Sequence, residues 1–243
     1  MSDVRTYSHA STLARAAAEH FVALAQEAVS ARGRFAVALA GGSTPRAMYA
    51  LLATGEFAPR VDWTRVHIFW GDERCVPPDH PDSNYRMARE ALLDHVPIPS
   101  DHVHRIQGEI EPALAADAYE RTLQAFFTPR QPRFDLILLG LGDDGHTASL
   151  FPGMAAIHEQ TRWVVAHYVS KLSAWRVTLT PVAINAAANV TFLVSGATKA
   201  ERLSQALTGP YQPDILPSQI VRPAEGRLLW LVDAAAAAQL KSW

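Results

Sequence analysis

The sequence has one cysteine, no excess of basic residues and no long apolar run. Its 22 Lys and Arg against 24 Asp and Glu give a formal net charge of −2. This argues against nucleic acid or an acidic membrane as the main partner, because such surfaces are bound by clustered cations. Cys75 has no second cysteine to pair with, which fits a reducing compartment. Because free cysteines are mostly packing residues, we expect Cys75 to pack and not to act as a nucleophile.

The chain also lacks the apolar segments that membrane insertion or export requires. No run approaches the ~18 residues of a transmembrane helix, and residues 1–10 are polar, without the apolar centre of a signal peptide. We therefore expect a soluble, cytoplasmic protein. No cluster of His and Cys has the spacing of metal ligands, so the sequence predicts no metal site.

Short apolar runs alternate with helical stretches along the chain. The 243 residues, 49% of them apolar, suffice for one large domain or two small ones. Four runs have the composition of strands buried in a parallel sheet: residues 35–40, 66–70, 134–139 and 190–194. Their alternation with helices predicts an α/β fold with a mostly parallel sheet and helices on both faces. We expect a single domain over residues 1–243, with a small lobe around residues 209–230 as the alternative.

The apolar run 134–139 and the glycine-rich loop after it carry the most specific signal. Gly142 belongs to this loop, and Asp143, Asp144 and His146 follow it directly. Glycines let the backbone turn tightly and approach a ligand, and open α/β sheets bind ligands at the carboxyl ends of their strands. A histidine beside a carboxylate at this place predicts a general base with an orienting group. Either aspartate could be that group.

A second loop, after the run 35–40, has the features of an anion site. Gly41 and Gly42 precede Ser43, Thr44 and Pro45, which predict a helix start with a hydroxyl N-cap and proline at the first helical position. Backbone N–H groups at a helix start and the positive end of the helix dipole attract anions. The same residues also fit an ordinary strand-to-helix turn. They match neither the Walker pattern nor the dinucleotide G-x-G-x-x-G pattern.

Charged residues follow two further predicted strands or lie near them. Asp72 and Arg74 come after the run 66–70, where an exposed turn is the alternative interpretation. Lys199 is predicted in the first turn of a helix, where its charge opposes the dipole unless an anion binds there. A phosphate held by hydroxyls, Arg176 and Lys199 would account for these features together.

Six segments in the expected order resemble the 6-phosphogluconolactonase family, and together they cover essentially the whole chain. They are AGGSTP at 40–45, WGDERCVP at 70–77, GDDGHTASLFP at 142–152, RVTLT at 176–180, SGATK at 195–199 and LPS at 216–218. The resemblance implies an enzyme that hydrolyses 6-phospho-D-glucono-1,5-lactone to 6-phospho-D-gluconate in the oxidative pentose phosphate pathway. It also implies a Rossmann-like sheet, no required cofactor, and a small phosphorylated sugar lactone as the partner.

Two other functions on the same fold are weighed against this one. Glucosamine-6-phosphate deaminases resemble the chain but have Tyr where Arg74 stands, and Glu where Phe151 stands. Their motif also continues as Ile-Ala-Phe, where this chain has Thr-Ala-Ser after His146. A non-catalytic sugar-phosphate sensor would be expected to lose the histidine, which is present. These positions favour the lactonase.

The resemblance and the chemistry of an ester in a ring assign roles to the candidate residues. We expect His146 to activate water, Asp144 to orient its imidazole, and Arg74 to stabilise the oxyanion. The remaining candidates are expected to contact the substrate, with Ser43, Thr44, Arg176 and Lys199 at its phosphate. These substrate-binding candidates are Gly41, Gly42, Ser43, Thr44, Asp72, Gly142, Asp143, Arg176 and Lys199.

Overall fold

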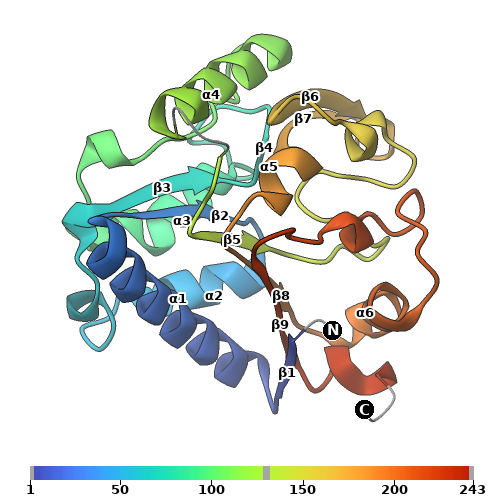
Figure 1. The fold of residues 1–243 in the computed structure, drawn as a ribbon, viewed down its shortest axis with the longest axis horizontal. Coiled ribbons are helices and arrows are strands. Elements are labelled where there is room, and N and C mark those ends of the chain that lie inside the picture. The colour runs from blue at the N-terminus through green and yellow to red at the C-terminus, as the bar shows by residue number, and fades with distance from the viewer. Residues whose placement is uncertain (1–2, 128–131, 241–243) are drawn as a thin grey trace.

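A parallel sheet forms the centre of the protein (Figure 1). The computed structural model describes residues 3–127 and 132–240. Six strands pair in the order β1-β9-β8-β5-β2-β3, and each neighbouring pair is parallel. The strands are β1 (Asp3–Tyr7), β2 (Phe35–Leu39), β3 (Val66–Trp70), β5 (Leu136–Leu139), β8 (Asn189–Val194) and β9 (Arg227–Asp233). The predicted α/β fold with a mostly parallel sheet is confirmed.

A smaller antiparallel sheet was not expected from the sequence. Its strands lie in the order β4-β7-β6: β4 (Asp72–Arg74), β6 (Val164–Val169) and β7 (Ala174–Leu179). Gly71 joins the two sheets, because its N–H donates to the carbonyl of Leu39 and its carbonyl accepts from Leu179. The charged residues after β3 therefore lie in a strand and not in an exposed turn.

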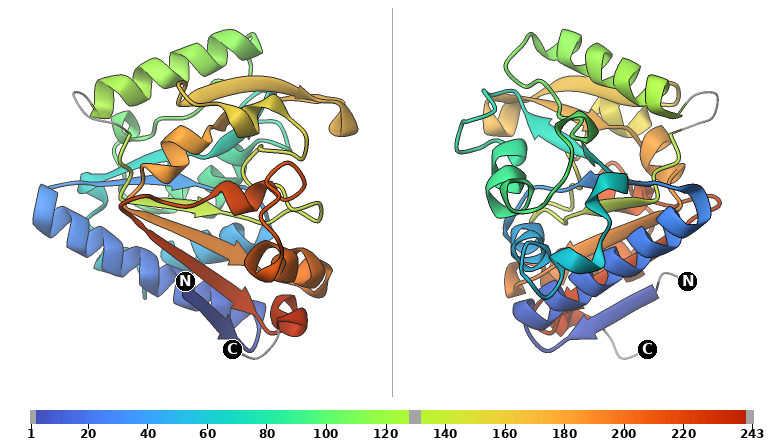
Figure 2. Two further views of the ribbon diagram at one scale, coloured as in Figure 1. Left: turned by 45° about the vertical axis from the view of Figure 1, so that its right-hand side comes forward. Right: turned by 90° about the vertical axis from the view of Figure 1, so that its left-hand side faces the viewer.

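Different elements cover the two faces of the central sheet. The helices are α1 (Ala10–Arg32), α2 (Ser43–Leu52), α3 (Asn84–Ala91), α4 (Pro112–Phe127), α5 (Pro181–Asn185) and α6 (Ala200–Thr208). Helices α1 and α2 pack together on one face, while the antiparallel sheet lies on the other face with α4 outside it (Figures 1 and 2). Strands β2 and β5 are buried along their whole length, as expected for strands covered on both faces. Within the described residues, no helix has the length and apolar character needed to cross a membrane.

Helix α2 begins earlier than the sequence suggested. Its N-cap is Gly42, with φ 105° and ψ 169°, and no side chain caps the helix. Ser43 is the first helical residue, so the expected hydroxyl N-cap and the placement of Pro45 at the first position were wrong. The reason is the positive φ of Gly42, which a residue with a side chain adopts only at a cost. The turn out of β2 is thus completed by the glycine, before the hydroxyl residues begin.

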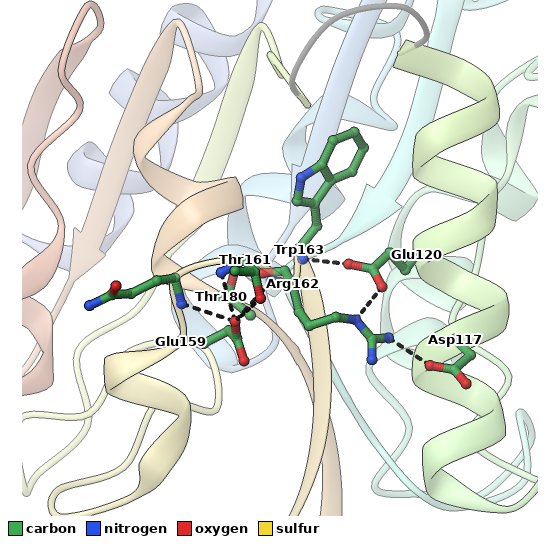
Figure 3. A network of polar contacts seen from close by, with 8 residues as sticks. Asp117, Glu120, Glu159, Thr161, Arg162, Trp163 and Thr180 are labelled. Atoms are coloured by element: carbon green, nitrogen blue, oxygen red, sulfur yellow. Dashed lines mark hydrogen bonds and ion pairs between the residues drawn. The ribbon is translucent and has the colours of Figure 1, made fainter.

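Arg162 anchors the antiparallel sheet to α4 (Figure 3). Its Nη2 donates to Asp117 at 2.6 Å, and its Nε donates to Glu120. The buried Glu120 carboxylate also accepts the backbone N–H of Trp163 at 2.5 Å, and Thr180 Oγ1 donates to the Arg162 carbonyl at 2.6 Å. These contacts fix the entry into β6 relative to the helix.

We expect Arg162→Ala to lower the free energy of unfolding by about 1.5–3 kcal/mol, the usual range for hydrogen bonds to charged groups. The loss arises because Glu120 stays buried with fewer partners. The change is measured by denaturant unfolding. Arg121→Ala, an exposed arginine in the same helix, is the matched control and is expected to stay within about 0.5 kcal/mol of the parent. Equal losses in the two variants would contradict this role of Arg162.

Candidate active site

A cavity of about 370 Å³ opens where the carboxyl ends of the central strands meet the antiparallel sheet. This volume is in the range of small-molecule sites. Ten of the sequence-predicted residues line it: Gly41, Gly42, Asp72, Arg74, Gly142, Asp143, Asp144, His146, Arg176 and Lys199. Ser43 and Thr44, the first two residues of α2, are not among its lining residues.

His146 and Asp144 form a hydrogen-bonded pair in this cavity. The distance from His146 Nδ1 to Asp144 Oδ1 is 2.6 Å, and the backbone N–H of His146 donates to the same oxygen at 3.2 Å. An ionised carboxylate only accepts hydrogen bonds, so Nδ1 carries the proton and Nε2 is left as the basic nitrogen. The ring stacks on Phe151, with centroids 4.2 Å apart. Of the two aspartates left open by the sequence, Asp144 contacts the imidazole.

The loop around His146 depends on Gly142. Its N–H donates to the His146 carbonyl at 2.8 Å, which closes the loop on itself. A Cβ atom at position 142 would lie 2.0 Å from His146 Nδ1, and the imidazole would have to leave Asp144 to make room. The glycine is therefore required here by close approach of the histidine ring.

Asp144 has a second partner that the sequence did not reveal. Lys171, in the 3₁₀ turn Ser170–Leu172 between β6 and β7, places its Nζ 2.9 Å from Asp144 Oδ2. The hydrogen bond from His146, supported by Lys171, holds the pKa of Asp144 well below its usual range, although burial opposes this. Nothing in the local sequence distinguishes Lys171 from a surface lysine.

Asp72 is fixed by two residues that sequence reasoning also missed. Ser149 Oγ donates to Asp72 Oδ2 at 2.7 Å, and Asn84 Nδ2 donates to the Asp72 carbonyl at 3.0 Å. Ser149 lies in the motif that contains His146, which is a signal that could have identified it. Asn84, at the start of α3, has no such signal. Through Asp72, the histidine loop is tied to β4 and the start of α3.

Glu73 stabilises the start of α3, where Asn84 lines the cavity. Its carboxylate accepts the backbone N–H groups of Asn84 and Tyr85, each at 2.8 Å, and the hydroxyl of Ser83 at 3.1 Å. Burial raises the pKa of Glu73, while these backbone donors work in the opposite direction. Its role is therefore to position α3 and Asn84.

Arg74 and Arg176 are two cations that line the cavity together with Asp72, whose carboxylate attracts Arg176 without forming an ion pair with it. They are directly opposite each other in the β4–β7 register. Arg176 Nη1 donates to the carbonyl of Trp175 and Arg74 Nη1 to that of Asp82, while the Arg74 Nε is buried without a hydrogen-bond partner. Neither forms an ion pair with any residue of 3–127 or 132–240. Burial, and then repulsion by Arg74, lowers the pKa of Arg176. Two adjacent guanidinium groups that are in no ion pair with the described residues favour binding of an anion.

Lys199, unlike Arg74 and Arg176, is paired with a carboxylate. It ends the 3₁₀ turn Ala197–Lys199 before α6, and its Nζ lies 2.5 Å from Asp143 Oδ1. Asp143 also accepts a hydrogen bond at its carbonyl from Arg202 Nε. The charge of Lys199 is therefore already balanced by a carboxylate, unlike that of Arg176. In the part of the chain that the structure describes, no group of three or more His, Cys, Asp or Glu is arranged to hold a metal ion.

The chain is similar to named proteins along nearly its whole length. A family model described as glucosamine-6-phosphate isomerases/6-phosphogluconolactonase matches residues 8–230. The 6-phosphogluconolactonase of Nostoc sp. is 44% identical over 217 residues, covering 88% of each chain. That of Mycobacterium leprae is 40% identical over 252 residues, covering 98% of each. The solved 6-phosphogluconolactonase of Trypanosoma brucei matches with a TM-score of 0.89 and 32% identity, over 99% of both chains.

Proposed function

The chain belongs to the family of glucosamine-6-phosphate isomerases and 6-phosphogluconolactonases, and we propose that it hydrolyses 6-phospho-D-glucono-1,5-lactone to 6-phospho-D-gluconate in the oxidative pentose phosphate pathway. The observation that carries this proposal is one cavity that contains both the His146–Asp144 pair and the guanidinium of Arg176, which is in no ion pair with the described residues. A base and an anion site are the two things that a phosphorylated lactone requires. Relatives named 6-phosphogluconolactonase at 40–44% identity support the assignment.

His146 acts as the general base in this scheme. Nε2 takes a proton from water as the water oxygen attacks the lactone carbonyl carbon, and Asp144 stabilises the imidazolium that forms. Arg74, with N–H groups of the surrounding loops, stabilises the negative charge on the carbonyl oxygen. The bond from the carbonyl carbon to the ring oxygen then breaks, and the ring oxygen receives the proton from the imidazolium. The acid product ionises at neutral pH, so each turnover releases one proton.

Cationic residues of the same cavity hold the phosphate in this scheme. Arg176 donates a charge-assisted hydrogen bond to it, and Lys199 shares its charge between the phosphate and Asp143. The backbone of Gly41 and Gly42 forms the adjacent wall, at the start of α2. Ser43 and Thr44 follow these glycines in α2 but do not line the cavity, so no contact with the phosphate is assigned to them. Anchoring the phosphate places the lactone carbonyl beside His146, so that the reacting groups are already in position when water attacks.

We expect the protein to release protons from freshly generated 6-phosphogluconolactone faster than the spontaneous rate, and to release no ammonia from glucosamine 6-phosphate. The reason is that Phe151 stacks on His146 at the position where the deaminase pattern has glutamate. Arg74→Tyr is expected to release no ammonia either, since Phe151 remains. Proton release and ammonia are measured in parallel, with His146→Ala as the blank. Deamination by the parent protein above that blank would overturn the lactonase proposal in favour of a deaminase.

A further inference from the structure

We propose that Lys171 is a positioning residue, whose ammonium group holds Oδ2 of Asp144 and thereby limits how strongly this carboxylate favours the protonated form of His146. This inference rests on the proposed function, in which His146 is the base. Lys171 reaches the pair from a different sheet: it belongs to the turn between β6 and β7, whereas Asp144 and His146 follow β5.

The two oxygens of Asp144 are divided between two side chains. Oδ1 accepts from His146 Nδ1 at 2.6 Å, and Oδ2 accepts from Lys171 Nζ at 2.9 Å. The turn that carries Lys171 is closed by Ser173, which has φ 48° and ψ 40° and donates its N–H to Ser170. The neighbouring Leu172 lines the cavity together with Lys171. The turn therefore holds Lys171 at the cavity. In sequence, Lys171 lies 27 residues after Asp144.

Charge balance explains why this contact matters for a base. An unshared carboxylate stabilises the imidazolium and so favours the protonated histidine, which has no free nitrogen to accept the proton of water. Lys171 offsets part of the carboxylate charge while leaving the hydrogen bond to Nδ1 in place. The other charged groups that line this cavity are Asp72, Arg74, Asp143, Arg176 and Lys199. Of these, Asp143 and Lys199 are paired with each other. Asp144 contacts the imidazole directly, and Lys171 acts on the imidazole through Asp144.

Replacing Lys171 by a neutral residue tests the proposal. In Lys171→Met, the carboxylate charge acts fully on the imidazolium, so the acid limb of the pH profile of kcat/KM is expected to move up by ~0.5–1 pH unit. This is the lower end of the usual effect of a nearby charge, because the lysine side chain is well exposed. On that limb the activity falls about 3–10-fold, with KM nearly unchanged. Lys171→Arg keeps the charge and is expected to restore most of the profile.

Titration of the free protein separates this inference from the proposed function. The His146 imidazole nitrogens, identified by their loss in His146→Gln, are followed by NMR without substrate. The titration midpoint is expected to be higher in Lys171→Met than in the parent, and unchanged in Arg121→Met, which removes one exposed positive charge from α4. Equal midpoints would overturn the role of Lys171 even in an active lactonase. A raised KM with an unmoved acid limb would also overturn it, because Lys171 would then bind substrate directly. Absence of lactone hydrolysis with a shifted midpoint would instead refute the proposed function alone.

Discussion

His146→Ala is expected to lower kcat about 10²–10⁴-fold, the usual contribution of a general base, with little change in KM. The substitution removes the group that takes the proton of water but leaves the phosphate site intact. The residual rate comes from substrate positioning and from the remaining electrostatic stabilisation of the oxyanion. The rate is measured by proton release at saturating lactone, with the spontaneous opening of the lactone subtracted.

The matched control is His95→Ala, because His95 is exposed and its Nε2 contacts the carbonyl of Glu90 away from the cavity. This variant is expected to keep the parent kcat. Under conditions where chemistry limits the rate, a His146→Ala protein that retains more than about a third of the parent kcat would show that His146 is not the base.

Arg176→Ala is expected to lower kcat/KM for the phosphorylated lactone ~10–150-fold. A charge-assisted hydrogen bond contributes about 1.5–3 kcal/mol, and each 1.4 kcal/mol is about tenfold in an equilibrium or rate ratio. Unphosphorylated gluconolactone has no group for Arg176 to bind, so its turnover, already poor, is expected to change little. Arg176 faces Arg74 in the sheet, and the repulsion by Arg74 exceeds the attraction by Asp72. Removal of Arg176 therefore relieves a repulsion, and the free energy of unfolding without ligand is not expected to fall.

Two companion variants define what Arg176 does. Arg176→Lys keeps a positive charge but loses the planar donor geometry of the guanidinium, and an intermediate loss is expected. Lys199→Ala is expected to have a smaller effect than Arg176→Ala, since Lys199 is already paired with Asp143. Equal losses on phosphorylated and unphosphorylated lactones, or a clear loss of stability in Arg176→Ala, would contradict a phosphate-binding role.

The sequence was sufficient wherever a property is encoded by neighbouring residues. Strands β2, β3, β5 and β8 are buried along all or most of their length, and strands of this kind consist of short apolar runs. The runs at 35–40, 66–70, 134–139 and 190–194 predicted them within one or two residues at each end. The glycine-rich loops after β2 and β5 were placed at the carboxyl edge for the same reason. The pairing of His146 with Asp144 spans two residues, and the sequence narrowed it to two candidates.

Elements that depend on distant partners could not be predicted in this way. Strand β1 (Asp3–Tyr7) is polar and lies at the edge of the sheet, where it is held by backbone pairing with β9. Backbone N–H and carbonyl groups are the same in every residue, so such pairing leaves no side-chain pattern. The three-residue strand β4 reads as a charged turn for the same reason, although pairing with β7 makes it part of the site.

The start of α2 and the contacts in the cavity also depend partly on neighbouring residues and partly on the tertiary structure. The residue types at 41–45 indicated a helix start, but the backbone conformation of Gly42 decided which residue begins the helix and left Ser43 and Thr44 outside the cavity lining. Lys171 meets Asp144 only because β6 and β7 form a hairpin whose turn lies against the loop after β5. Local residue order encodes burial, turns and short-range pairs, whereas the packing of the two sheets against each other determines which charges meet.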